Sequence, residues 1–85
     1  MKKVTLITTK QCPKCPMAKV FWRELKSEYK FEYEEIDAVT KLGQSLIEDF
    51  SIMSVPAAIV QEDGKKEMTF VGLPSRQKVI QAIEG

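Results

Sequence analysis

Eighty-five residues, 44% of them hydrophobic and 29% charged, indicate one small globular domain over residues 1–85 and exclude a disordered or fibrous chain. There is no histidine, which excludes Ser-His-Asp catalysis, Cys-His catalysis and histidine-dependent zinc sites. The net charge of +1 argues against a nucleic-acid-binding protein, and no apolar run approaches the roughly 18 residues of a membrane span.

The charge is distributed unevenly along the chain. Residues 1–30 carry +6, residues 31–63 carry −7 and residues 64–85 carry +2. Both cysteines lie in the basic segment. This pattern indicates either ordinary solvated surfaces or a thiol-bearing face that attracts acidic partners.

The first half of the chain predicts a strand, a helix and a second strand. Residues 4–8 form a β-branched run typical of a buried strand. A helix is expected to open at Cys12, with Pro13 in its first position, although Pro16 would remove its first intrahelical donor and loosen that turn. Residues 31–36 alternate apolar and acidic side chains, which predicts a strand with one wet face. The helix has an apolar core face at Ala18, Phe21, Trp22 and Leu25.

The second half predicts a helix, a hairpin and a last helix. A helix is expected over residues 39–50, with Asp37 or Thr40 as its cap. Gly43 inside it costs about 1 kcal/mol against alanine unless it permits close packing. Residues 55–60 and 67–71 read as antiparallel strands joined by a turn at Asp63-Gly64, and Ser75 is a suitable cap for a final helix. The apolar positions of the middle helix are Val39, Leu42, Leu46, Ile47 and Phe50, and those of the last are Val79, Ile80 and Ile83.

The predicted order β-α-β-α-β-β-α specifies the fold class. Its first half is a βαβ unit, in which a right-handed crossover joins two parallel strands. Its second half adds a hairpin and a helix. We therefore expect an α/β fold in which one mixed four-stranded sheet is flanked by helices.

The tetrad Cys12-Pro13-Lys14-Cys15 carries the predicted chemistry. Two cysteines three residues apart on a helical turn are close enough to form a disulfide. A cysteine at a helix N-terminus is stabilised as a thiolate, and Lys14 and Lys10 add positive potential. Cys12 is therefore the predicted nucleophile and Cys15, one turn deeper, the predicted resolving thiol. Half of a zinc site or a pair of buried cysteines are the other interpretations of an isolated Cys-x-x-Cys, but its position after a strand and before a helix favours redox chemistry.

The chain resembles the thioredoxin superfamily, and within it the small glutaredoxin-like redoxins. The resemblance rests on the strand VTLITT, the tetrad CPKC, the dipeptide Val55-Pro56, and Asp63-Gly64 followed by Gly72. It implies a thioredoxin-like fold in which Pro56 is cis and packs beside the disulfide. It also implies that Val55 offers its backbone to an extended substrate strand. The predicted substrate-binding residues are Pro13, Lys14, Val55, Pro56 and Gly72.

Three departures from the family pattern refine this prediction. Gln11 stands where thioredoxins have Trp before the first cysteine, and Leu6 stands where they have a buried Asp, so water is expected to accept the proton. The acidic residue that would meet the glutathione amine in glutaredoxins is missing after Gly72. The stretch Gly72-Leu73-Pro74 is similar to redoxins that serve ribonucleotide reductase and draw electrons from a thioredoxin reductase.

The resemblance implies a thiol–disulfide oxidoreductase that reduces protein disulfides. Ribonucleotide reductase is one candidate substrate, and a thioredoxin reductase is preferred over glutathione as the electron donor. We expect a cytoplasmic monomer that binds neither nucleic acid nor membrane. No cofactor or metal is expected, because the redox group is the Cys12–Cys15 dithiol itself. Two cysteines and the absence of a signal-peptide pattern favour a reducing compartment.

Two alternatives use the same thiols differently. A soft-metal carrier could bind Cu(I) through Cys12 and Cys15, although metallochaperone domains follow the order β-α-β-β-α-β and Lys10 and Lys14 would repel a cation. A dimer could share a metal or an iron–sulfur cluster through Cys12. Met17 and Met53 are expected either to border the thiols as a soft apolar surface or to fill gaps.

Overall fold

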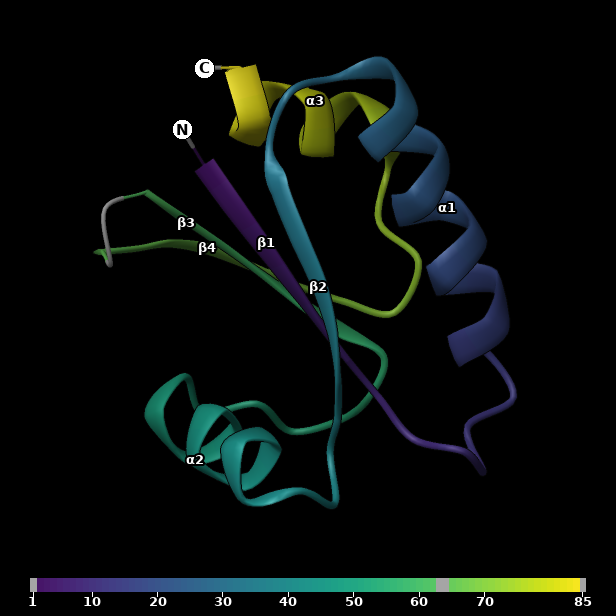
Figure 1. The fold of residues 1–85 in the computed structure, drawn as a ribbon, viewed down its shortest axis with the longest axis vertical. Coiled ribbons are helices and arrows are strands. Elements are labelled where there is room, and N and C mark those ends of the chain that lie inside the picture. The colour runs from purple at the N-terminus through teal and green to yellow at the C-terminus, as the bar shows by residue number, and fades with distance from the viewer. Residues whose placement is uncertain (1, 63–64, 85) are drawn as a thin grey trace.

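The computed structural model describes residues 2–62 and 65–84 and contains all seven predicted elements. In chain order they are β1 (Lys2–Thr8), α1 (Cys15–Glu28), β2 (Glu32–Asp37), α2 (Lys41–Asp49), β3 (Ala57–Glu62), β4 (Lys65–Val71) and α3 (Arg76–Glu84), as Figure 1 shows. The order β-α-β-α-β-β-α is confirmed. The predicted turn at Asp63-Gly64 lies outside the described residues.

The four strands form one mixed sheet in the order β2-β1-β3-β4. The central strand β1 runs parallel to β2, with Thr8 opposite Asp37, and antiparallel to β3, with Ile7 opposite Ala57. Strand β4 pairs antiparallel with β3, as predicted for a hairpin. The carboxyl end of β1 therefore lies beside the end of β2 and the beginning of β3, which is where the loops of the candidate site meet.

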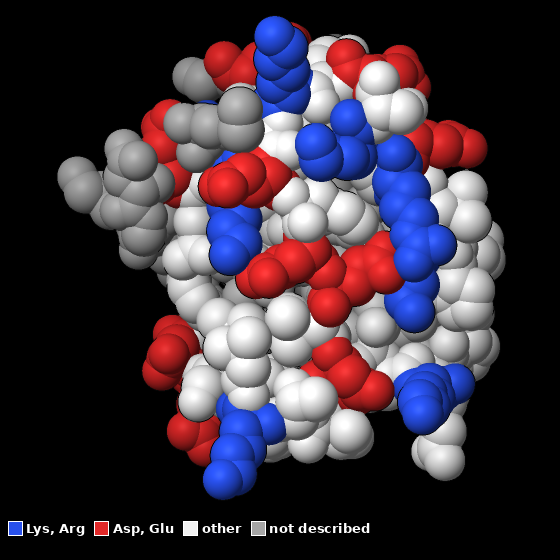
Figure 2. Space-filling model, in the orientation of Figure 1, with Lys and Arg blue, Asp and Glu red and all other residues white. Residues whose placement is uncertain are grey.

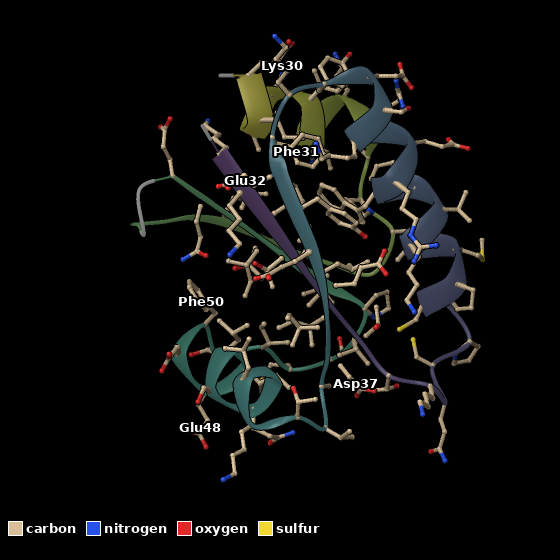
Figure 3. All side chains as sticks on the ribbon, in the orientation of Figure 1. Lys30, Phe31, Glu32, Asp37, Glu48 and Phe50 are labelled. Atoms are coloured by element: carbon tan, nitrogen blue, oxygen red, sulfur yellow. The ribbon has the colours of Figure 1, made fainter. Side chains whose placement is uncertain are left out.

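Helices cover both faces of the sheet (Figure 1). One cluster of buried residues packs α1 and α3 against the sheet: Val4, Leu6, Ala18, Trp22, Leu25, Phe31, Ala58, Val60, Phe70, Val79 and Ile83. The other packs the α2 side: Ile7, Ala38, Ile52, Ala57 and Ile59, with Leu46, Ile47, Phe50 and Val55 against them. Figure 3 labels one aromatic residue of each cluster, Phe31 just before β2 and Phe50 at the end of α2. The predicted core face of the first helix, including Trp22, is confirmed.

The first helix begins two residues later than predicted, at Cys15 rather than Pro13. Its first residue is Cys15 and its N-cap is Lys14, so Cys12 and Pro13 lie in the preceding loop. Pro16 explains the shift, because a proline has no N–H and is tolerated only where that donor would lack an intrahelical partner. The first helical hydrogen bond is instead donated by Ala18 N–H to the Lys14 carbonyl, at 3.0 Å.

The second helix also differs from the predicted pattern. Val39 precedes α2 and Leu42 lies on its outer side, with exposed fractions of 76% and 53%, so neither belongs to its buried face. The cause is Gly43, which is buried and packs so closely on the Asp37–Ala38 backbone that a Cβ atom would lie 2.3 Å from the Asp37 carbonyl oxygen. Of the two predicted caps, Thr40 is the observed one, since its hydroxyl accepts from Gly43 N–H at 3.0 Å.

Strand boundaries shift by one to two residues. Strand β2 begins at Glu32, after Phe31, and β3 begins at Ala57, after Val55 and Pro56. Pro56 cannot donate to a strand ladder, which explains why β3 begins at the residue after it. The Ser75 carbonyl accepts from Val79 N–H at 3.1 Å, so Ser75 stands at the start of α3 as predicted.

Candidate redox site

Both cysteines lie at the end of the molecule where β1 gives way to α1. The backbone N–H of Cys12 donates to the Thr9 carbonyl at 3.4 Å, and that of Cys15 donates to the Cys12 carbonyl at 3.3 Å. Two successive turns therefore lead from the strand into the helix and place Cys15 in its first turn. Both cysteines are free thiols in this structure.

Cys12 is the accessible thiol of the pair. Its side chain is partly exposed, and its Sγ donates to the Val55 carbonyl at 3.7 Å. Partial burial opposes ionisation, but a hydrogen bond from the Cys15 thiol, the backbone N–H groups of Lys14 and Cys15 and the charge of Lys14 hold the pKa of Cys12 below its usual value. Although Cys12 is not the helix cap, the N–H groups at the start of α1 still face its sulfur, so the predicted direction holds.

Cys15 has the opposite surroundings, although it is one turn away. It is only 1% exposed. Burial and the hydrogen bond to Cys12 raise the pKa of the Cys15 thiol, against weaker opposing effects of the Thr9 backbone and Lys19. Cys15 is therefore the buried thiol with the raised pKa, and Cys12 the partly exposed thiol with the lowered pKa.

A second segment reaches the thiols from the other side of the sheet. The Val55–Pro56 peptide bond is cis, as the resemblance implied, and the Val55 carbonyl faces the Cys12 sulfur. The Pro56 carbonyl accepts from Gly72 N–H at 2.7 Å, and Gly72 has a φ of 76°, a conformation that favours glycine. The Cys12–Val55 and Gly72–Pro56 hydrogen bonds thus bring three predicted site residues, Val55, Pro56 and Gly72, together with Cys12.

The loop around Cys12 is basic. Pro13 and Lys14 are exposed beside it, and residues 9–23 contain four cations and no acidic residue. In Figure 2, basic side chains run along the side formed by α1, and acidic side chains gather over β2 next to it. A hollow of about 380 Å³ lies beside the loop, lined by Thr9, Lys10, Gln11, Asp37 and Val39. Figure 3 shows Asp37 at the end of β2, near the loop that leads to the cysteines.

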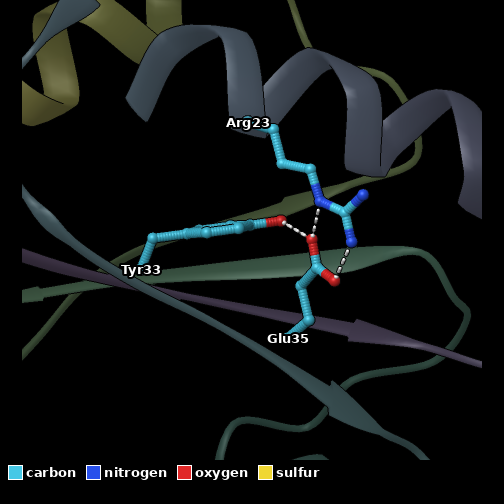
Figure 4. A network of polar contacts seen from close by, with 3 residues as sticks. All are labelled: Arg23, Tyr33 and Glu35. Carbon is cyan, nitrogen blue, oxygen red and sulfur yellow. Dashed lines mark hydrogen bonds and ion pairs between the residues drawn. The ribbon is translucent and has the colours of Figure 1, made fainter. Parts of the chain in front are cut away.

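One polar network near the site was not predicted from the sequence. Arg23 on α1 holds Glu35 on β2 through two hydrogen bonds of 2.7 Å, and the Tyr33 hydroxyl donates to the same carboxylate at 2.7 Å (Figure 4). The Arg23 guanidinium, and then the Tyr33 hydroxyl, hold the pKa of Glu35 below its usual range against partial burial. Burial and Glu35 raise the pKa of Tyr33. The network ties the helix that carries Cys15 to the edge of the sheet.

Comparisons with known proteins agree with this geometry. Residues 2–84 match the family model described as thioredoxin domain. The chain belongs to the thioredoxin family. A probable thioredoxin from Methanothermobacter marburgensis is 32% identical over 83 residues, which cover 95% of this chain and 91% of that one. With this family and both cysteines present, the chain is a thiol–disulfide redox protein.

Solved thioredoxins share the fold at lower identity. A thioredoxin-2 from the malaria parasite superposes with a TM-score of 0.84 at 21% identity, covering 99% of this chain and 82% of that one. A mutant thioredoxin from Halobacterium salinarum gives 0.82 at 20% identity, covering 98% and 72%. These neighbours confirm the thioredoxin-like fold, with its mixed four-stranded sheet and three helices.

Two negative observations concern residues 2–62 and 65–84. Within them, no three or more Cys, Asp or Glu side chains converge in a way that could hold a metal ion. None of the helices in the same ranges has the length and apolar character of a membrane span.

Proposed function

We propose that this protein reduces protein disulfides, with Cys12 as the attacking thiolate and Cys15 as the resolving thiol. The observation that carries the proposal is the contrast between the two sulfurs. Cys12 is partly exposed and favoured as a thiolate, whereas Cys15 is 1% exposed and favoured as a thiol. Exchange chemistry needs one accessible nucleophile and one protected thiol that attacks second.

The reaction follows from these positions. The Cys12 thiolate attacks one sulfur of the substrate disulfide, a mixed disulfide forms, and the other substrate sulfur leaves as a thiolate. Cys15 then loses its proton and attacks the Cys12 sulfur. The Cys12–Cys15 disulfide forms and the second substrate thiolate leaves, so the substrate gains two electrons and the dithiol loses them.

Val55 and Pro56 are proposed as the substrate platform, with Pro13, Lys14 and Gly72 around it. The Val55 carbonyl, which accepts from the Cys12 thiol, faces the point at which a substrate sulfur would bond. An extended substrate segment could add to the Val55 backbone as an extra strand does to a sheet edge.

The electron donor is proposed to be a thioredoxin reductase rather than glutathione. The support is the absence, after Gly72, of the acidic residue that would meet the glutathione amine. Ribonucleotide reductase is one candidate substrate. A cytoplasmic location, a monomeric state and independence from added cofactors stay predictions.

Single cysteine variants test the proposal with a disulfide-bonded peptide as substrate. Cys12→Ser should abolish reduction, whereas Cys15→Ser should react once and stop as a mixed disulfide, which intact mass identifies. Full reduction by Cys12→Ser would contradict the assignment.

Equilibration across a glutathione redox series tests the competing uses of the thiols. Conversion between dithiol and internal disulfide at roughly −200 to −270 mV is expected. A persistent glutathione adduct would favour a glutaredoxin-type reaction instead. If the thiols never pair, binding of Cu(I), or of a shared metal or cluster, becomes the better explanation.

A further inference from the structure

An apolar groove runs along α1 beside the loop that carries Leu73. It has a volume of about 430 Å³ and is lined by Met17, Val20, Phe21, Glu24 and Leu73. Met17, Val20 and Leu73 have exposed fractions of 58%, 56% and 44%. Met17 and Val20 fall outside the face of α1 that packs on the sheet, so the fold of this chain does not use them as core.

Two residues that line the groove, Met17 and Leu73, are close in the chain to residues of the thiol site. Leu73 directly follows Gly72, whose N–H donates to the Pro56 carbonyl. Val55, the residue before Pro56, accepts a hydrogen bond from the Cys12 sulfur through its carbonyl. On the other wall, Met17 lies two residues beyond Cys15 in the first turns of α1. Both walls of the groove therefore belong to segments that also carry residues of the redox site or of the proposed substrate platform.

The proposed reaction decides what can occupy such a groove. While a mixed disulfide exists, the substrate chain is bonded to Cys12, so its neighbouring residues are held over this surface at a high effective concentration. Even a modest apolar contact then becomes populated. A free partner would lack this advantage, because it must offset its full loss of translational freedom.

We infer that the groove formed by Met17, Val20, Phe21 and Leu73 binds an apolar side chain of the polypeptide substrate, on one side of the substrate cysteine. The inference rests on the proposed function and names its substrate class. Preferred substrates carry a large aliphatic or aromatic residue near the cysteine, and Glu24 at the groove disfavours an acidic residue there.

The test measures reduction of short Gly/Ser peptides that each carry one cysteine in a disulfide to a common thiol. A single Leu is moved through the positions on both sides of that cysteine. The fully reduced protein should react about five- to tenfold faster when Leu stands at one or two neighbouring positions on one side. An equal rate for all positions would overturn the inference.

Matched variants locate the effect. Val20→Gln should abolish the preference for Leu, and Leu73→Ser should do the same if the first variant folds poorly. Leu42→Gln is the control, because Leu42 is an exposed aliphatic residue on α2 with a similar exposed fraction of 53%. A preference that survives in both groove variants would assign it to another surface.

A small aromatic disulfide, 5,5′-dithiobis(2-nitrobenzoate), separates the two proposals. Its reaction with the wild type and the groove variants should be equally fast, because it has no chain to place in the groove. If it reacts and the Leu preference is absent, the groove inference fails and the proposed function stands. If neither it nor any peptide exchanges with Cys12, both fail. Concentration-dependent self-association that Val20→Gln removes would show a second copy in the groove and overturn the inference.

Discussion

The two faces of the sheet differ both in what they bury and in what they bring to the thiols. The α1/α3 face buries large side chains, with Trp22, Leu25 and Phe31 at 1% exposure or less, and it delivers both cysteines. The α2 face is built from smaller residues around Ile7 and Ile59, and the chain leaving it delivers Val55 and Pro56. The site therefore lies at a junction. One face supplies most of the buried volume, and the other sets where the substrate platform lies.

The largest expected effect is the loss of packing on the α1/α3 face. Trp22→Ala should destabilise the fold by about 3–5 kcal/mol, a large part of the stability of a domain of this size. No hydrogen bond of the indole N–H is found within residues 2–62 and 65–84, so the ring's packing is what is lost. Urea unfolding followed by circular dichroism measures the change. Ile52→Ala on the α2 face should lower the free energy of unfolding by less. An equal loss for both variants would show that the two faces do not differ in their contribution to stability.

Gly43→Ala tests close packing on the α2 face. Alanine is the better helix former by about 1 kcal/mol, yet its Cβ would lie 2.3 Å from the Asp37 carbonyl, where backbone must move. A net loss of about 1–3 kcal/mol is expected. Ser45→Ala, at an exposed position of the same helix, should be neutral or slightly stabilising. If both variants are equally stable, Gly43 is not a packing requirement.

The two thiols should titrate in different pH ranges. Because its pKa is lowered, Cys12 should stay reactive toward iodoacetamide as the pH falls below the ordinary thiol value of about 8.5. In Cys12→Ser, Cys15 should react only slowly and above that value, although loss of the Cys12 hydrogen bond removes part of the increase in its pKa. Mass spectrometry of alkylated protein across pH gives both curves. Superimposed curves would contradict the assigned roles.

The smallest expected effect concerns the link between α1 and β2. The folded-state pKa of Glu35 is lowered, so its contribution to stability is present above the unfolded-state pKa and is lost as the pH falls through the folded-state value. Glu35→Gln should therefore reduce stability slightly at neutral pH. The stability of this variant should also fall less steeply than that of the wild type as the pH is lowered. Glu48→Gln on α2 is the control. Unfolding midpoints between pH 3 and pH 7 reveal the difference, and identical acid slopes would exclude this role.

Local patterns predicted more of this molecule than did the contacts between its elements. Hydrophobic spacing identified every helix and strand, and the tetrad identified both thiols. The start of α1 was missed because Pro16 outweighed the preference of Pro13 for a first helical position. The outer side of α2 was mistaken for its core side because the contact of Gly43 with Asp37 cannot be read from spacing.

The polar network and the groove needed the tertiary structure. Arg23 and Glu35 lie 12 residues apart, and only the packing of α1 beside β2 brings them together. Val20 gave a faint signal, since it is an apolar residue outside the core face of α1. Leu73 gave none, because only the tertiary structure places its loop beside α1.

The position of β1 in the sheet also matters while the chain is being synthesised. β1 can pair with β2 once residue 37 has emerged from the ribosome, but its other edge is completed only when β3 extends to residue 62. At typical synthesis rates this interval lasts a few seconds. An apolar, β-branched strand with an open edge is a template for incorrect pairing. The nascent chain is therefore still open to incorrect pairing during this interval, before the second partner of its first strand exists.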